Sequence, residues 1–453
     1  MAQLLLYFSA LIFLALIVQK IGNKPRKTYE TASKIPHGPT KLPIIGNIHN
    51  LLSSQPHRKL RDLALKYGPL MHLQLGEVST IVISSPECAK EVMKTHDINF
   101  ATRPKILASE IISYNSTDIV FAPYGNYWRQ LRKICTLELL SLKRVNSFQP
   151  IREDELSNLV KWIDSEKGSP INLTQAVLSS IYSIASRSAF GKKYKDQQNF
   201  IAEVKKLIKL VGGFDIGDLF PSATWLQHVT GIRPKLERLH QQVDQILEGI
   251  INEHKEARSE AKDFERETED LVDVLIQYED GSNQDFTLTR NNIKAIILDI
   301  FAAGGDTSAK TIDWAMAEII KDSRIMRKAQ AEVREVFNMK RRVDENCINE
   351  LKYLKLVVKE TLRLHPPLPL LLPRECGQTC EIHGYNIPAK SKVIVNAWAI
   401  GRDSNYWTEP EKFYPRGSST ALLTTKGIIL SSFLSELEEG YALEAHFHPE
   451  LSK

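Results

Sequence analysis

One stretch of helical sequence constrains this chain more than any other. Residues 301–315, "FAAGGDTSAKTIDWA", lie inside a long apolar helical pattern. A glycine costs a helix interior roughly 1 kcal/mol relative to alanine, and an unpaired buried carboxylate costs more. Two adjacent glycines, an acid and a hydroxyl therefore need a reason. Either a bulky ligand approaches the backbone here, or the helix bends and Asp306 faces solvent; taken alone, the stretch favours the bend.

The rest of the chain is also mainly helical. Its 453 residues are 43% hydrophobic, which suffices for a large core. Helical periodicity dominates from about Pro86 to residue 365, with Pro/Gly punctuation between helices. Strand-like runs occur at "LMHLQLG" (70–76), "TIVISS" (80–85) and "KVIVNAWAI" (392–400). The pattern predicts a mainly α fold with small β-sheets, without internal repeats or a parallel α/β alternation.

The N-terminus has the pattern of a membrane anchor. Residues 4–18 are apolar throughout, and four basic residues follow them: Lys20, Lys24, Arg26 and Lys27. A cleaved secretory signal, the alternative, would carry its charges before the apolar run. The charge order predicts a lumenal N-terminus and a cytosolic body. We expect an anchor at residues 1–22 and a basic, proline-rich hinge at 23–45, although the proline segment alone also suits an ordinary surface loop.

Charge and cysteine usage exclude other classes of protein. The net charge of +5 comes without a dense basic run, so we expect no nucleic-acid partner. The cysteines are odd in number and scattered, which argues against a disulfide framework or a zinc site and for a reducing compartment. They are Cys88, Cys135, Cys347, Cys376 and Cys380.

Two further stretches carry charged pairs at helical spacing. Glu360 and Arg363 in "KETLRLHPP" are three residues apart and can form an ion pair, although such pairs are common. Trp128 and Arg132 in "YGNYWRQLRKIC" share one helical face, where a guanidinium and an indole N–H could bind an anionic group. Taken alone, this second stretch favours a solvated basic helix with one half-buried aromatic side chain.

Together, these stretches resemble the cytochrome P450 superfamily, specifically microsomal plant monooxygenases. The resemblance extends from Leu4 to about Pro415 and includes A-G-x-D-T at 303–307, E-x-x-R at 360–363 and W-x-x-x-R at 128–132. It also includes "HPPLPLLLPRE" (365–375), "VNAWAIGRD" (395–403) and "KFYP" (412–415). The order and spacing of all six make coincidence a poor explanation.

The resemblance implies a haem b cofactor and a site distributed over four segments. Ala303 and Gly304 would leave room for haem, and Asp306 and Thr307 would be catalytic by delivering protons during oxygen activation. The remaining implied residues are Trp128, Arg132 and Arg374, which would bind the haem propionates, and Glu360 and Arg363, which would support the fold near the haem. The apolar stretches at 103–123 and 368–373 would line the substrate pocket.

The implied activity is the insertion of one oxygen atom from O2 into a small lipophilic substrate, of terpenoid type by analogy. Electrons would come from NADPH through NADPH–cytochrome P450 reductase at the endoplasmic reticulum membrane. Two alternatives stay open. One is a P450-like isomerase or dehydratase, against which the Asp306–Thr307 pair speaks. The other is a non-enzymatic, membrane-anchored binding protein or pseudoenzyme.

The sequence departs from the family after Pro415. The family pattern continues with a loop F-x-x-G-x-R-x-C-x-G whose cysteine thiolate binds the haem iron. Residues 416–453 contain no cysteine, and Cys376 and Cys380 lie in an ordinary strand region of the family. We therefore expect no metal ligand, an incomplete body at 46–415 with a C-terminally truncated fold, weak haem binding and no activity.

A shifted reading frame accounts for the departure. Residues 435–444, "SELEEGYALE", can be written TCG GAG CTG GAA GAA GGT TAT GCC CTG GAA. Reading from the third base gives G-A-G-R-R-L-C-P-G, the family's ligand loop. The same shift turns "PRGSS" into P-E-R-F-L. We infer a one-base loss near the codon of Pro415 and expect residues 416–453 to be disordered.

The nucleotide sequence tests this inference directly. We expect the bases that encode residues 435–444, read in the shifted frame, to spell the cysteine loop. Codons for residues 435–444 whose third bases do not encode the cysteine loop in the shifted frame would contradict the inference.

Overall fold

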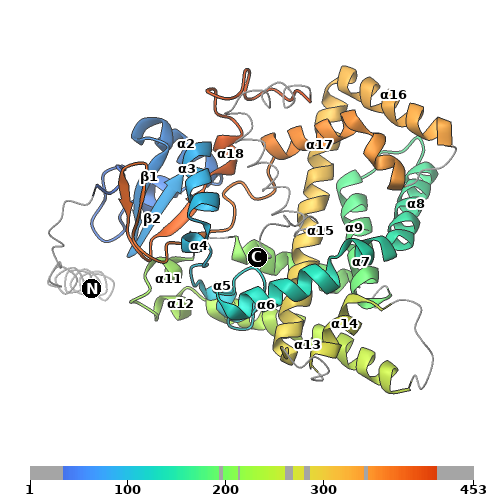
Figure 1. Ribbon diagram of the computed structural model, residues 1–453, viewed down its shortest axis with the longest axis horizontal. Coiled ribbons are helices and arrows are strands. Elements are labelled where there is room, and N and C mark those ends of the chain that lie inside the picture. Colours follow the sequence, from blue (N-terminus) through green and yellow to red (C-terminus); the bar gives the residue numbers. More distant parts are fainter. Residues whose placement is uncertain are drawn as a thin grey trace, which may run out of the picture.

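The computed structural model describes residues 34–192, 197–212, 215–260, 269–279, 286–340 and 345–415. The predicted anchor at 1–22, residues 23–33 of the predicted hinge and the tail at 416–453 lie outside these ranges. Within them, no helix is both long and apolar enough to cross a membrane. Helices form most of the described structure, and two small sheets complete it, which confirms the predicted mainly α fold (Figure 1).

The helices follow one another along almost the whole described chain. In the first half they are η1 (Ile48–Leu51), α2 (Pro56–Tyr67), α3 (Pro86–Lys90), η2 (Glu91–Thr95), α4 (Asp97–Phe100), α5 (Leu107–Ile112), α6 (Asn126–Ile134), η3 (Cys135–Leu139), α7 (Leu142–Ser147), α8 (Gln149–Ser165) and α9 (Leu173–Phe190). In the second half they are α10 (Gln197–Val211), α11 (Ile216–Leu219), α12 (Leu226–Val229), α13 (Ile232–Glu260), α14 (Leu271–Glu279), α15 (Arg290–Lys321), α16 (Ser323–Lys340), η4 (Glu345–Glu350), α17 (Lys352–Leu364) and α18 (Ala397–Ile400).

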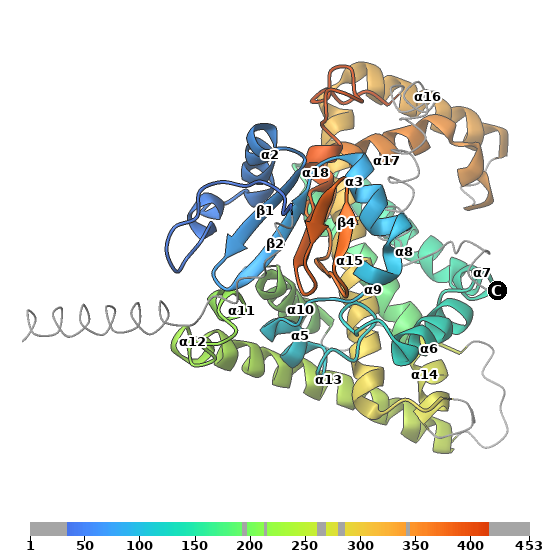
Figure 2. The same cartoon turned by 60° about the vertical axis from the view of Figure 1, so that its left-hand side comes forward.

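The larger sheet joins segments from both ends of the described chain. Its order is β1 (Leu70–Leu75), β2 (Val78–Ile83), β6 (Lys392–Val395) and β3 (Arg374–Glu375). β1 and β2 form an antiparallel hairpin, while β2 and β6 pair in parallel with Thr80 opposite Lys392. A second sheet pairs β4 (Cys380–Ile382) with β5 (Tyr385–Ile387). In Figure 2 the sheets lie beside α2 and α3, on one side of the helical body.

The predicted run at 392–400 is strand only in its first half. The strand β6 ends at Val395, and α18 follows, because the buried Asn396 accepts a hydrogen bond from the backbone N–H of Ala399 at 3.1 Å and so caps the short helix.

The described end of the predicted hinge also has a structural role. His72 in β1 donates its backbone N–H to the carbonyl of His37 at 3.0 Å, so residues beside Pro36 and Pro39 run along the sheet edge.

Helix α15 organises the helical body. Its 32 residues span about 48 Å at 1.5 Å per residue. Thr289 and Asn292 form a capping box at its start. The buried Phe301 packs against Tyr182 of α9 and Phe200 of α10, with ring centroids 5.0 and 4.6 Å apart. Figure 1 shows α15 crossing the molecule between the sheet side and the other helices.

A buried histidine joins α13 to the start of α14. His254 lies within hydrogen-bond distance of the Ile250 carbonyl (Nδ1, 2.7 Å) and of Asp270 Oδ2 (Nε2, 2.9 Å). Burial lowers the pKa of His254, but the hydrogen bond and charge of Asp270 outweigh burial, and the net shift is upward. Both ring nitrogens therefore act as donors when the imidazole is protonated, and the cation stabilises the fold.

This contact predicts a pH-dependent contribution to stability. The folded pKa of His254 lies above its unfolded value of 6.5, so its stabilisation is complete below pH 6.5 and is lost as pH rises through the folded pKa. We expect H254Q to lower the free energy of unfolding by about 1–3 kcal/mol at pH 6 and by less at pH 9. Urea unfolding at several pH values measures this difference. The exposed His228 gives the matched control H228Q, and an equal loss for H254Q at both pH values would contradict the assignment.

Candidate functional site

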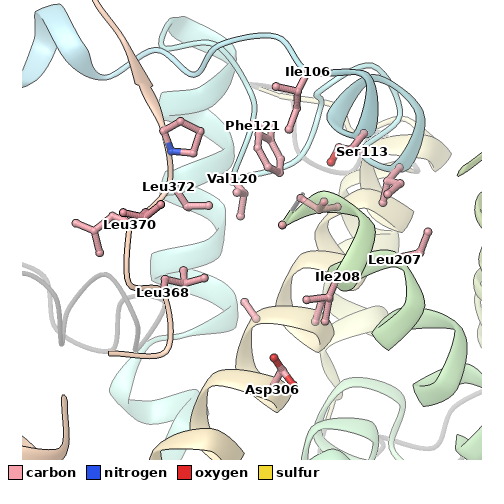
Figure 3. A pocket seen from close by; sticks show the side chains of 18 of the residues that line it. Ile106, Ser113, Val120, Phe121, Leu207, Ile208, Asp306, Leu368, Leu370 and Leu372 are labelled. Atoms are coloured by element: carbon pink, nitrogen blue, oxygen red, sulfur yellow. The ribbon is translucent and has the colours of Figure 1, made fainter. Parts of the chain in front are cut away.

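A cavity of about 500 Å³ lies against the middle of α15. Its wall is mostly apolar and includes residues of α2, α5, the loop at 120–121, α10, α11, α15, the segment at 367–373 and β6. Figure 3 shows Val120, Leu372 and Leu207 approaching the hollow from different directions, with Asp306 on the α15 side. Both segments that the sequence predicted as pocket-lining, 103–123 and 368–373, contribute residues to this wall.

Three of the predicted site residues lie on the α15 wall. Ala303, Asp306 and Thr307 all line the cavity. The hydroxyl of Thr307 donates to the carbonyl of Ala303 at 2.6 Å, one helical turn back, and the helix continues unbroken through this point. Asp306 forms an ion pair with Lys310, which also lines the cavity. Asp306 is therefore not an unpaired buried acid, because Lys310 compensates its charge at the edge of the cavity. The unbroken helix also shows that the residue does not lie at a bend.

The two adjacent glycines have different surroundings. A Cβ on Gly305 would overlap the ring of Tyr182, so this glycine allows α9 and α15 to approach closely. A Cβ on Gly304 would meet nothing within 4 Å, and the residue is exposed. Gly304 therefore leaves open space beside the helix, whereas Gly305 is required by packing. The sequence pattern alone could not distinguish these two reasons.

The predicted anion-binding residues gather at one place but have partners within the protein. Trp128 donates its indole N–H to the Ile119 carbonyl at 3.0 Å, and the guanidinium of Arg132 lies 5.4 Å from the centre of the Trp128 ring. Arg374 forms an ion pair with Asp97 at 2.9 Å. These contacts hold the three side chains in place around the segment that leads to the cavity wall.

Arg103 belongs to the same group and was missed by the sequence reasoning. It donates to the carbonyls of Val120 (3.3 Å), Leu372 (3.4 Å) and Pro373 (3.3 Å). Burial lowers its pKa, and the nearby charges of Arg374 and Arg132 lower it further. Three guanidinium groups close enough to influence one another form a cationic cluster, which suits a ligand with carboxylates. The only signal in the sequence was an arginine at the start of an apolar loop.

Glu360 and Arg363 form a buried ion pair away from the cavity. Two N–H groups of Arg363 donate to the two carboxylate oxygens of Glu360 at 2.8 Å, and both side chains are only 2% exposed. The guanidinium also donates to the carbonyls of Gly401 (2.6 Å), Pro410 (2.7 Å) and Lys412 (2.9 Å). The pair thus fastens α17 to the irregular segment at 401–414, and burial without these bonds would be costly.

Comparison with known proteins assigns the family. The model of the family described as cytochrome P450 matches residues 36–416. The chain belongs to the cytochrome P450 family. The helical fold agrees with this: a zebrafish cytochrome P450, in a structure with abiraterone, superposes with a TM-score of 0.69 over 86% of this chain and 90% of that chain, at 22% identity.

The similar sequences are plant cytochromes P450. Cytochrome P450 71D11 of Lotus japonicus is 58% identical over 91% of this chain and 84% of its own length. Premnaspirodiene oxygenase of Hyoscyamus muticus is 52% identical over 89% and 81%, respectively. Germacrene A hydroxylase of Tanacetum parthenium is 50% identical over 92% and 84%. By this level of identity the chain is a plant cytochrome P450 monooxygenase.

The described residues fit part of a haem. The cationic cluster suits two propionate carboxylates, and the small side chain of Ala303 on the cavity wall suits the approach of a flat ring to α15, whereas Gly304 is exposed and is not among the residues that line the cavity. A thiolate ligand does not fit any cysteine. All five lie in the described ranges and none lines the cavity. Burial raises the pKa of the Cys376 thiol to about 12, which is the opposite of what a metal ligand needs.

The glycine pair gives a prediction with a built-in control. We expect G305A to destabilise the fold by about 1–3 kcal/mol, because its methyl group overlaps the Tyr182 ring. We expect G304A to be neutral or stabilising by about 0.5–1 kcal/mol in the chain without haem, because alanine is the better helix former and space is open. Thermal unfolding measures both. Equal effects of the two substitutions would show that the surroundings of the glycines do not differ as described.

Proposed function

We propose that this cytochrome P450 takes a terpenoid hydrocarbon, or a molecule of similar size and apolarity, into the cavity beside α15 for oxygenation. The observation that carries the proposal is a cavity of about 500 Å³ whose wall is mostly apolar, with a smaller number of polar side chains that include Asp299, Asp306 and Thr307. An apolar pocket with a few polar groups suits a lipophilic substrate that is held by shape. Several relatives support the substrate class, since their names refer to premnaspirodiene, germacrene A and amorpha-4,11-diene.

Residues of this chain would have three roles. Asp306 would hold or release a proton at its carboxylate, which forms an ion pair with Lys310. Thr307 would orient a proton donor through its hydroxyl, which is anchored on the Ala303 carbonyl. Trp128, Arg132 and Arg374 would bind haem propionates, and Glu360 with Arg363 would support the fold. Haem, when bound with a thiolate, supplies the oxygen-activating chemistry of the family.

We further propose that residues 416–453 are the product of a shifted reading frame and that the printed chain is inactive. The family match ends at residue 416, next to the inferred base loss at the codon of Pro415. No cysteine follows Cys380 in the printed sequence, so no axial thiolate is supplied by residues 416–453. The pseudoenzyme alternative makes the same spectral prediction for the printed chain, but it does not predict recovery when one base is restored.

The supply of electrons and the location belong to the same proposal. Electrons would come from NADPH through NADPH–cytochrome P450 reductase, and residues 1–22 would anchor the protein in the endoplasmic reticulum membrane with its body in the cytosol. The apolar run at residues 4–18, followed by four basic residues, supports this orientation.

A spectrum of the reduced protein under carbon monoxide tests the proposal. We expect no red-shifted, thiolate-type Soret band from the printed chain. We expect the band to appear after one base is inserted at the codon of Pro415. A thiolate-type band from the printed chain would show that one of its five cysteines ligates iron, and it would overturn the account of an inactive form.

The restored chain allows a matched control and a substrate test. Replacement of the restored loop cysteine by alanine should abolish the band while the rest of the protein is unchanged. The restored chain, supplied with NADPH and the reductase, should oxygenate amorpha-4,11-diene or premnaspirodiene. A band without turnover of either hydrocarbon would leave the monooxygenase assignment intact and contradict the terpenoid substrate.

A further inference from the structure

Two buried acids meet where the cavity wall touches α15. Asp299 lies on α15, two turns before Asp306, and lines the cavity. Asp118 precedes the wall residues Val120 and Phe121 and is fully buried. The hydrogen bonds of the two carboxylates are to backbone N–H groups, Asp118 Oδ2 is buried without a donor among the described residues, and the two acids are close enough to influence each other's pKa. Two ionised carboxylates in contact inside a protein would repel strongly, so one proton must lie between them.

The two carboxylates together hold a short piece of backbone. Asp299 Oδ2 accepts the N–H groups of Ile119 (2.9 Å) and Val120 (3.2 Å). Asp118 Oδ1 accepts the N–H of Phe121 at 2.9 Å. Three consecutive backbone donors, in a loop without regular secondary structure, are thus satisfied by one acid pair. Without the pair they would be buried donors with no acceptor, each costing about 1–3 kcal/mol.

The same piece of backbone connects the cavity to the cationic cluster. Its carbonyls accept hydrogen bonds from Trp128 (Ile119, 3.0 Å) and Arg103 (Val120, 3.3 Å). Its side chains at Val120 and Phe121 face the cavity, as Figure 3 shows. A shift of residues 119–121 would therefore move the cavity wall and the propionate-binding donors together.

We propose that Asp118 and Asp299 form a carboxyl latch that shares one proton, fastens residues 119–121 to α15 and thereby sets the shape of the cavity. Asp299 is a positioning residue in this role. It acts through the backbone of the wall residues and not by direct chemistry on a substrate.

The electrostatic surroundings agree with a shared proton. Burial raises the pKa of Asp299 well above its usual value, and the charge of Asp118 raises it further. Burial also raises the pKa of Asp118. The ionisable groups that face the pair are Arg103, which stays cationic at neutral pH, and Tyr127 of α6, whose pKa is raised to about 12 by burial and by Asp118. Both keep their charge state at neutral pH, so the acid pair is the titratable group of this contact.

The sign of the pH effect follows from the raised pKa. In the unfolded chain both acids ionise near pH 4, so folding above that pH must take up a proton. Stability from the pair is complete at low pH and declines as pH rises toward the folded pKa. An asparagine at position 299 keeps an oxygen for the N–H groups and supplies an N–H to Asp118 without proton uptake. The variant D299N should therefore keep residues 119–121 fastened to α15, and the contribution of this contact to stability should no longer depend on pH.

Hydrogen exchange and thermal unfolding of the full chain test the latch. We expect D299N to keep the amides of residues 119–121 protected and to reduce the fall in the unfolding midpoint between pH 5.5 and 8.5 by roughly half. We expect D299A to lower the hydrogen-exchange protection of these three amides at least about tenfold. D313N is the control, because Asp313 also lies on α15 and accepts a hydrogen bond, from Thr174 at 2.6 Å.

Two outcomes would overturn the proposal. One is that D299N exposes residues 119–121 as fully as D299A does. The other is that D299N follows the same pH profile as the unsubstituted chain. If D299A does not fold, D299N and D118N still decide, because both keep the shape of the original side chain. Added amorpha-4,11-diene should protect the wall in the unsubstituted chain and in D299N; the absence of that protection in both would count against the proposed substrate and not against the latch.

Discussion

The close approach of α9 to α15 at Gly305 is the contact on which the rest of the structure depends. It places the ring of Tyr182 against the helix at Gly305, and Phe301 of the same helix packs against Phe200, which fixes α15 within the aromatic core. Once the helix is fixed there, its next turn presents Asp306 and Thr307 to the cavity. The geometry of the site is thus a consequence of helix packing. Gly305 is the glycine that this packing requires, whereas Gly304 has open space beside it.

The buried charges divide into two kinds with different functions. Glu360 and Arg363 neutralise each other completely and use their remaining donors to bind backbone carbonyls, so they hold an irregular segment in place. The arginines at 103, 132 and 374 repel one another, although Arg374 also pairs with Asp97, and burial adds to the cost of the Arg103 charge. An arrangement that is costly alone and favourable with an anion is what a binding site requires. The family assignment implies haem, and its carboxylates are the anion that we propose for this cluster.

Sequence reasoning predicted the helical class, the family and the location of the α15 site, because these depend on periodicity and on motifs of several residues. It predicted the Glu360–Arg363 pair because a spacing of three places both on one helical face. It did not find Arg103 or the Asp118–Asp299 pair, since their partners are far away in sequence and their neighbours are ordinary. It also extended the strand at 392–400 too far, because an apolar run does not reveal that Asn396 caps a helix.

The parallel pairing of β2 with β6 has a consequence for biosynthesis. Residues 79 and 391, whose side-chain hydroxyls meet at 3.2 Å across these strands, are 312 positions apart. At roughly 5–20 residues per second on a ribosome, the hairpin of β1 and β2 waits about 15–60 s for its neighbour. During that interval one edge of β2 presents unpaired N–H and C=O groups, which are a template for pairing with another extended chain. The hairpin is therefore exposed to wrong strand pairing until β6 has been synthesised and covers this edge.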